Sequence, residues 1–195
     1  YPALLPLITA EFQIDYATAG LLVGVLWASY SLMQFPGGVV ADWAGERAVL
    51  TLSLVGSFVG MAAIFLAPVL GAFVVATAIL GVGNGLYGTT RVTVLSDTYP
   101  DMDNTAISIN QASGNVSNTV LPILAGTVAA ALGWRMGFGI LVPLFALTAV
   151  GVWFVVPRRT SPPTNEDESV RETMRAVAAA VKRREVLMVT FVLFM

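Results

Sequence analysis

The chain has 195 residues, of which 56% are hydrophobic and 11% are charged, and its formal net charge is −2. Soluble domains are about one quarter charged, so this composition excludes an ordinary water-soluble domain and favours a membrane protein. The sequence contains no Cys and no His, which excludes disulfides, thiolate or imidazole metal sites, and imidazole proton shuttles within these residues. We therefore expect no metal and no cofactor.

Apolar segments separated by short polar turns follow one another along the chain. Residues 1–10 are apolar but shorter than the roughly 20 residues that a span needs, so we interpret them as the end of a first helix that begins outside this sequence. Polar, Pro-rich or Gly-rich turns follow at 11–15, 37–47, 68–71, 99–104 and 133–135. Between them lie five segments that predict complete membrane-spanning helices: 18–41, 47–67, 71–98, 105–132 and 136–156.

The last part of the chain is polar and then apolar again. Residues 158–185 begin with a Pro-containing linker, and 166–185 carry an apolar stripe with acids at the start and bases at the end, as a helix dipole favours. We expect a helix on the membrane surface, with a regulatory or partner-binding helix as the alternative. Residues 186–195 begin another apolar span, so the sequence is expected to be a piece of a longer chain.

The cations set the expected orientation. Arg47 and seven Lys or Arg residues between 158 and 185 account for eight of the ten cations. Cytoplasmic loops carry an excess of Lys and Arg, so we expect loops 42–47 and 158–185 to be cytoplasmic in a multi-pass protein of the cell (plasma) membrane. No basic patch indicates a nucleic-acid partner; the expected surroundings are a lipid bilayer.

Residues 37–47 join two long stretches without charge and have the sequence Gly-Gly-Val-Val-Ala-Asp-Trp-Ala-Gly-Glu-Arg. This turn resembles the signature loop between helices 2 and 3 of major facilitator superfamily (MFS) transporters. Four residues match that pattern: Gly38, Asp42, Gly45 and Arg47. Trp43 and Glu46 depart from it, because the family usually has a cation at both positions. The later run Gly133-Trp134-Arg135-x-x-Phe138 resembles the family's turn between helices 5 and 6.

The resemblance implies an all-α, polytopic transmembrane bundle, the N-terminal six-helix half of such a transporter. Residues 1–157 would hold the partial helix 1 and helices 2–6, 158–185 the central cytoplasmic loop, and 186–195 the start of helix 7. The C-terminal half of the same chain would be its partner. The resemblance also implies a cytoplasmic gating loop that acts as a latch. Its members would be Gly38, Asp42, Gly45, Arg47 and Asp97. The alternative is an ordinary turn with solvated charges.

The fourth segment contains one cation well inside a span. Asn84, Tyr87 and Arg91 lie on one face of this helix at spacings of three and seven residues. A cation at the centre of a span costs roughly 3 kcal/mol and normally faces a cavity or a partner. Arg91 therefore either lines the solute pathway, as helix 4 does in this family, or reaches the cytoplasmic interface or Asp97.

Two further polar faces are visible in the pattern. The fifth segment carries Ser108, Gln111, Asn115 and Asn118 in one stripe, which must face protein or water rather than lipid. The stripe could form interhelical hydrogen bonds or line the solute pathway. Gln111 and Asn115 are the candidates for lining the pathway. The second segment carries Trp27, Tyr30, Ser31 and Gln34 on one face, which we expect to pack and occasionally to contact the pathway. The glycine pairs 20/24, 56/60 and 81/85 predict close helix approaches.

These features predict a secondary active transporter that moves a small solute by alternating access, driven by an ion gradient. The alternative is a membrane scaffold or assembly protein that transports nothing. An enzyme is not expected, because paired intramembrane acids, Cys and His are all missing, and no phosphate-binding glycine loop indicates ATP use. Arg91 makes an organic anion one candidate solute. The coupling ion, the direction of transport and the oligomeric state are left open.

Overall fold

The computed structural model describes residues 1–160, which fold into α-helices and one short 3₁₀ helix, with no strand in that range. The predicted helix at 166–185 and the predicted span at 186–195 lie outside the described residues. The elements are η1 (Pro2–Leu4), α1 (Leu5–Phe12), α2 (Tyr16–Ala44), α3 (Glu46–Leu66), α4 (Leu70–Thr98), α5 (Asp103–Leu132), α6 (Trp134–Gly139) and α7 (Val142–Val155).

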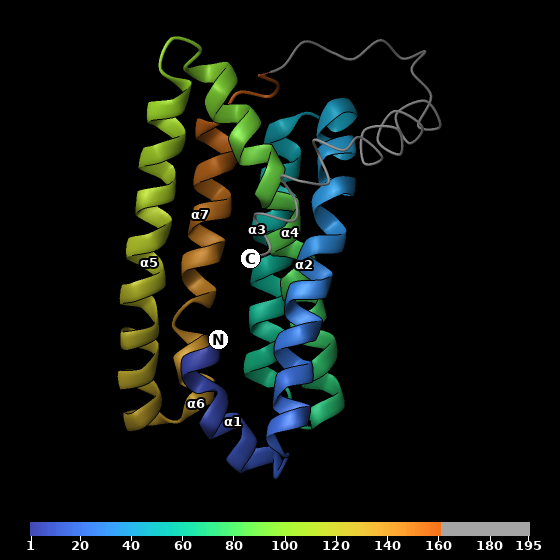
Figure 1. Cartoon of the computed structure of the whole chain (residues 1–195), viewed down its shortest axis with the longest axis vertical. Coiled ribbons are helices and arrows are strands. Elements are labelled where there is room, and N and C mark those ends of the chain that lie inside the picture. The colour runs from blue at the N-terminus through green and yellow to red at the C-terminus, as the bar shows by residue number, and fades with distance from the viewer. Residues whose placement is uncertain (161–195) are drawn as a thin grey trace, which may run out of the picture. The chain divides into compact units, whose positions relative to one another are not determined.

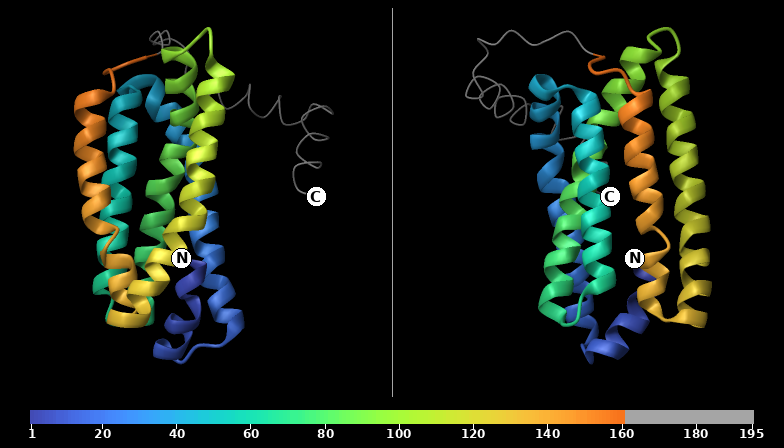
Figure 2. Two further views of the ribbon diagram at one scale, coloured as in Figure 1. Left: turned by 90° about the vertical axis from the view of Figure 1, so that its left-hand side faces the viewer. Right: turned by 180° about the vertical axis from the view of Figure 1, so that it is seen from behind.

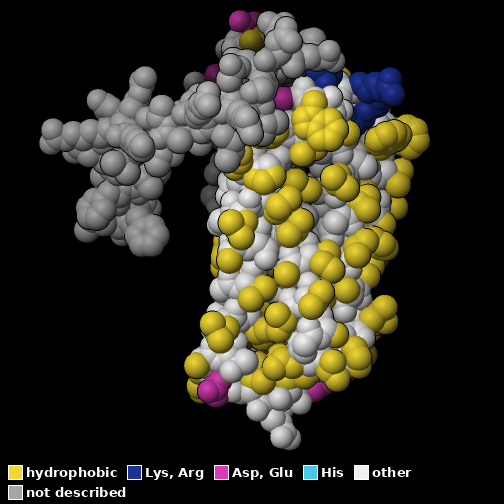
Figure 3. All heavy atoms as spheres, turned by 90° about the vertical axis from the view of Figure 1, so that its right-hand side faces the viewer, with side chains coloured by type: hydrophobic (Ala, Val, Ile, Leu, Met, Phe, Trp, Pro, Cys, Tyr) yellow, Lys and Arg dark blue, Asp and Glu magenta, His cyan; other side chains and the backbone are white. Residues whose placement is uncertain are grey.

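Within residues 1–160, five helical stretches are long and apolar enough to cross a membrane: Tyr16–Ala44, Glu46–Leu66, Leu70–Thr98, Asp103–Leu132 and Trp134–Val155. On the face shown in Figure 3, apolar side chains cover the middle of the bundle, and charged side chains appear at its two ends. The all-α bundle and its five complete spans are therefore confirmed. The second helix begins two residues before its predicted start, because Asp15 caps it by accepting a hydrogen bond of 2.8 Å from the Thr18 N–H.

The predicted span at 136–156 is present, but the expectation that it is one continuous helix was wrong. α6 ends at Gly139 and α7 begins at Val142, with a turn between them. Pro143, the second residue of α7, has no N–H to donate, and its ring would clash with the carbonyl of Gly139 in a continuous helix. The span is therefore a short helix followed by a longer one.

α4 lies between α2 and α3 and packs against both along its length (Figure 1). α7 packs on the other side of α3, as both views of Figure 2 show. α5 contacts α6 and η1 at one end of the bundle and α4 at the other. Only Ala125 and Ala129 of α5 are fully buried in the described part of the chain, so α5 is the most exposed of the long helices.

Glycines allow α4 to approach its neighbours. A Cβ atom on Gly81 would lie 2.5 Å from the Leu26 carbonyl oxygen, and one on Gly85 would overlap the Tyr30 carbonyl, so this pair faces α2. A Cβ on Gly60 of α3 would lie 2.5 Å from the Leu80 N. The predicted close approaches at pairs 56/60 and 81/85 are confirmed. The pair 20/24 is different, because a Cβ at either position meets nothing within 4 Å in the described structure.

The end of the bundle opposite the α2–α3 turn is held by one carboxylate. Glu11, at the end of α1, forms an ion pair with Arg135 and accepts a hydrogen bond from the Trp134 indole N–H. Arg135 also donates to the Ala67 carbonyl at 2.9 Å and lies 4.4 Å from the Trp134 ring centroid. These bonds join α1, the α3–α4 turn and α6. The Arg135 and Trp134 hydrogen bonds lower the pKa of Glu11 below its ordinary value of 4.5.

A ring cluster lies beneath this carboxylate. Neighbouring rings have centroids 5.7–6.1 Å apart, at tilted or edge-on angles that favour aromatic contacts. Its members are Tyr1, Phe12, Phe73, Trp134 and Phe138. The Gly133-Trp134-Arg135-x-x-Phe138 run therefore supplies both the ring core and the cation of this end.

Replacing Gly81 by Ala should destabilise the bundle by about 1–3 kcal/mol, because the new methyl group meets backbone that cannot move aside easily. The measurement is thermal unfolding of the purified full-length protein in detergent. Gly24→Ala is the matched control, since a methyl group there has open space. Equal melting temperatures for the two variants would contradict the proposed close packing of α2 on α4.

Stability should fall on acidification through Glu11. Its folded pKa is lowered, so the carboxylate contributes stability that is complete above pH 4.5 and is lost as pH falls through the folded pKa. Glu11→Gln should flatten the drop in melting temperature between about pH 6 and about pH 3. Asp101→Asn, an exposed acid in the α4–α5 turn, should leave the drop unchanged. A Glu11→Gln profile parallel to the unmodified protein would disprove the role of this carboxylate.

Candidate functional site

The α2–α3 turn is built on one glycine. Gly45 has φ +86°, a left-handed conformation that favours glycine, and its N–H donates to the Ala41 carbonyl at 2.9 Å. The Arg158 carbonyl oxygen lies 2.6 Å from the position that a Cβ would occupy. Gly45 is therefore required twice, once by the backbone conformation and once by the chain that crosses it.

The other predicted latch residues lie around this turn. Gly38 is half-buried, with the Thr89 hydroxyl 3.9 Å from its Cβ position. Arg47 donates to the Trp153 carbonyl on α7 at 3.1 Å, and its guanidinium carbon lies 5.1 Å from the centroid of the Trp153 ring. Asp42 is exposed on the last turn of α2, and within residues 1–160 no hydrogen bond or ion pair joins it to Arg47. The latch role of these residues stays a prediction.

Glu46 binds the chain that leaves α7. It is 2% exposed at the first position of α3, and its carboxylate accepts a hydrogen bond of 2.9 Å from the Thr160 N–H. The Thr160 hydroxyl donates to the Asp97 carboxylate at 3.3 Å, which brings the end of α4 into the same group. Arg159 donates to the Trp43 carbonyl at 2.9 Å. Residues 158–160 thus connect the ends of α2 and α4 with the start of α3.

Arg91 bridges α4 and α5. It donates to the Asn110 side-chain oxygen at 3.1 Å and to the Gln111 side-chain oxygen at 2.8 Å. Its guanidinium carbon lies 5.3 Å from the centroid of the Tyr87 ring. Its Nε atom is buried without a hydrogen-bond partner in the described residues. The amides and the ring offset the free-energy cost of placing a cation inside a span. The sequence predicted the pathway, the cytoplasmic interface or Asp97 for Arg91, but not these amide partners.

Asn84 and Tyr87 line a pocket of about 250 Å³ between α2 and α4, together with Leu26, Trp27 and Tyr30. The Asn84 side-chain oxygen accepts a hydrogen bond of 3.0 Å from the Ser57 hydroxyl on α3. The Trp27 and Tyr30 rings meet edge to face, with centroids 5.5 Å apart. The predicted face of the fourth segment and the predicted aromatic face of the second segment thus meet in one pocket.

The polar stripe of α5 faces outward. The side chains of Ser108, Gln111, Asn115 and Asn118 are all exposed among the described residues. Gln111 accepts from Arg91, and Asn118 lines a separate cavity of about 170 Å³ near Tyr1. Polar side chains gain nothing from lipid tails, so this face requires water or a further polar surface.

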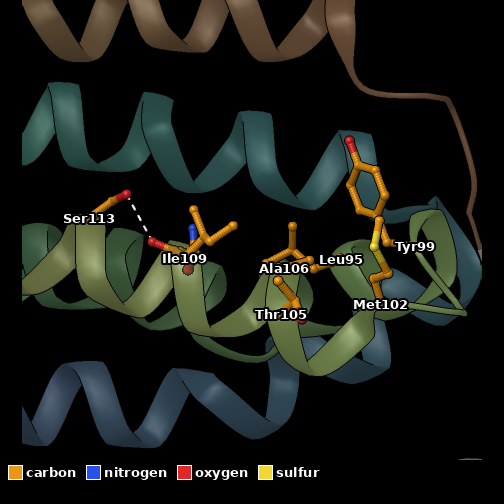
Figure 4. Close-up of a pocket in the computed structure, with 8 residues that line it drawn as sticks. Leu95, Tyr99, Met102, Thr105, Ala106, Ile109 and Ser113 are labelled. Carbon is orange, nitrogen blue, oxygen red and sulfur yellow. Dashed lines mark hydrogen bonds between the residues drawn. The ribbon is translucent and has the colours of Figure 1, made fainter.

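A third hollow lies between the ends of α4 and α5 near the α4–α5 turn. Figure 4 shows its mainly apolar lining, with Ser113 donating back to the Ile109 carbonyl at 2.9 Å. Its volume is about 380 Å³, and it is lined by Leu95, Tyr99, Met102, Thr105, Ala106, Ile109, Asn110 and Ser113. Its lining contains no charged side chain, so it could make apolar contacts with a ligand but no ion pair.

The family model of the Major Facilitator Superfamily matches residues 1–195. The chain belongs to this superfamily. It is 27% identical over 160 residues to the efflux pump azaK of Aspergillus niger, covering 80% of this chain and 34% of that protein. It is 32% identical over 154 residues to the drug efflux pump JefA of Mycobacterium tuberculosis, covering 74% of this chain and 28% of that protein.

A third relative is the hexuronate transporter of Bacillus subtilis, 21% identical over 150 residues, which cover 76% of this chain and 35% of that protein. The chain thus spans about a third of the length of these relatives. The membership supports a multi-pass membrane protein of the transporter class rather than an enzyme.

Removing one of the two α5 partners of Arg91 should destabilise the bundle. Gln111→Leu keeps the approximate size of the side chain but removes a hydrogen-bond acceptor from Arg91, at a cost of about 0.5–1.5 kcal/mol. Asn115→Leu, one turn further along the same exposed stripe, should change stability by less than about 0.5 kcal/mol. Thermal unfolding in detergent compares the two. A cost in Asn115→Leu as large as in Gln111→Leu would contradict the bridge.

Proposed function

We propose that this chain is the N-terminal half of a secondary active transporter of the plasma membrane. It would move a small organic solute by alternating access, together with the C-terminal half of the same polypeptide and driven by an ion gradient. Loops 42–47 and 158–185 would face the cytoplasm, as their cations predict. The names of the relatives, two efflux pumps and one hexuronate transporter, support small organic solutes as the class.

The observation that carries this proposal is the polar face of α4 and α5. Arg91 with its two amide partners, and the exposed Asn115 and Asn118 side chains, lie within helices long and apolar enough to span the membrane. Facing lipid, these groups would have no water to hydrogen-bond, at a cost of several kcal/mol each. A water-filled path between two halves meets this requirement, and in such transporters the solute site lies near the midplane.

The contacts at the α2–α3 turn support a division of roles within the latch. Arg47 is held by α7, while Glu46 and Asp97 are both bonded to Thr160. These bonds join helices of the same half and need not break when the two halves rock against each other. Asp42 is exposed on the last turn of α2. We propose that its carboxylate binds the opposing half in one of the two conformations only.

Asp42→Asn should therefore slow transport while leaving membrane insertion intact. Loss of one charge-assisted hydrogen bond corresponds to a change of roughly tenfold in rate. The measurement is solute movement by the full-length protein in proteoliposomes, with a panel of organic acids, sugars, amino acids and cationic drugs, with and without a pH gradient. Asp101→Asn is the matched control.

Normal turnover in Asp42→Asn would remove the latch from this account. If the unmodified protein moves no member of the panel, the transport proposal fails and a scaffold becomes the better explanation. Solute movement that does not respond to the pH gradient would contradict coupling to protons, but it would not contradict transport itself.

A further inference from the structure

We infer that the pocket between α2 and α4 is a subsite for flat aromatic organic anions, such as aromatic carboxylates. The residues Leu26, Trp27, Tyr30, Asn84 and Tyr87 define this aromatic subsite. The inference deepens the proposed function and rests on it, because a solute must enter the space between the two halves to reach the pocket.

The subsite lies near the middle of two candidate membrane spans and has a rigid base. Trp27 and Tyr30 are near the middle of α2, and Asn84 and Tyr87 are near the middle of α4. Gly81 and Gly85 bring α4 against the carbonyls of Leu26 and Tyr30, two residues that also line the pocket. The positions of its walls are therefore fixed by backbone packing before a solute arrives, which lowers the entropy cost of binding.

Aromatic rings dominate the lining. Trp27 is 58% exposed and Tyr87 is 36% exposed, so both rings have surface free for contact with a solute. Trp27 is held edge-on by Tyr30 at 5.5 Å. An aromatic pair gains about 0.5–1.5 kcal/mol beyond its buried area, an advantage that a saturated ring does not obtain. The volume of about 250 Å³ is below the 300–1,000 Å³ of pockets for drug-sized ligands, so it fits one ring system.

The polar groups of the subsite are set to donate. Asn84 uses its oxygen to accept from the Ser57 hydroxyl, which leaves its NH₂ group to donate to a solute. The Trp27 indole N–H is a donor only, and the Tyr30 and Tyr87 phenols can also donate. A solute with acceptor oxygens, such as a carboxylate, matches this set of donors.

The charge around the subsite selects the sign of the solute. Aromatic faces alone would also attract organic cations. However, Arg91 lies one helical turn from Tyr87, with its guanidinium 5.3 Å from the Tyr87 ring. The acids of the spans in the described chain lie at helix ends: Asp42, Glu46, Asp97 and Asp103. In a region of low dielectric constant, the nearby guanidinium therefore favours an anion over a cation.

The test uses three matched probes with the full-length protein, and it measures both binding in detergent and movement in proteoliposomes. The probes are 2-naphthoate, the saturated analogue decalin-2-carboxylate, and 2-naphthyltrimethylammonium. We expect 2-naphthoate to bind roughly tenfold more tightly than either of the others, as two aromatic contacts and one charge contact predict. Equal affinity for 2-naphthoate and its saturated analogue, or tighter binding of the ammonium, would overturn the inference.

Variants assign the binding to this pocket. Tyr87→Leu and Trp27→Leu should each weaken 2-naphthoate binding by about two- to tenfold, whereas Tyr87→Phe should retain most of it. Phe154→Leu, which removes an exposed ring on α7 outside the pocket, is the control. Equal binding in the control and in both Leu variants would overturn the inference.

The two proposals can fail separately. If the protein moves other members of the solute panel but shows no preference for 2-naphthoate, the aromatic subsite is wrong and transport stands. If 2-naphthoate binds in a manner that depends on Tyr87 and Trp27 while no solute moves, the subsite stands and the transport proposal is wrong.

Discussion

The backbone contact of α4 with α2 and α3 is the constraint on which this half-bundle depends. Glycines on α4 remove the side chains that would separate the helices, and the Leu26 and Tyr30 carbonyls occupy the space. Between apolar helices in lipid there is no hydrophobic gain, so close van der Waals packing has to provide the association. The same contact forms the base of the pocket between Trp27 and Tyr87. Core packing and the proposed solute contact thus involve the same pair of helices, α2 and α4.

Several polar side chains in the described bundle are hydrogen-bonded to a different element of the chain. Arg91 is held by amides of α5, Asn84 by Ser57 of α3, and Glu46 by the Thr160 backbone. These bonds cross between elements that hydrophobic contacts alone would leave free to slide. They concentrate on α4 and at the ends of the spans, where the chain turns.

The sequence alone predicts the membrane spans, because a run of about 20 apolar residues has few alternatives to a membrane helix. It was insufficient wherever a residue's partner lies far along the chain. Glu11 and Arg135 are separated by 124 positions, and nothing local marks them as a pair. Glu46 had the appearance of a departure from the family loop, yet an acid in the first turn of a helix is favoured by the dipole and here also receives the Thr160 N–H.

Pro143 is a local signal for a break in the helix, but the hydropathy of residues 136–156 favours a single span. A 21-residue apolar run predicts one helix, whereas the steric effect of Pro143 on the preceding turn divides it into α6 and α7. Arg91 shows a different difficulty. Its position inside a span was clear, whereas its amide partners on the neighbouring helix depend on how α5 is rotated, which periodicity alone does not determine.

The crossing of Gly45 by Arg158 has a practical consequence for dividing the polypeptide. Hydropathy alone would place a fragment boundary at the end of α7, near residue 157. A cut there would remove the N–H that Glu46 accepts and the Arg159 bond to Trp43. An N-terminal fragment that keeps both bonds therefore extends at least through Thr160, and split proteins or inserted tags should be joined beyond that residue.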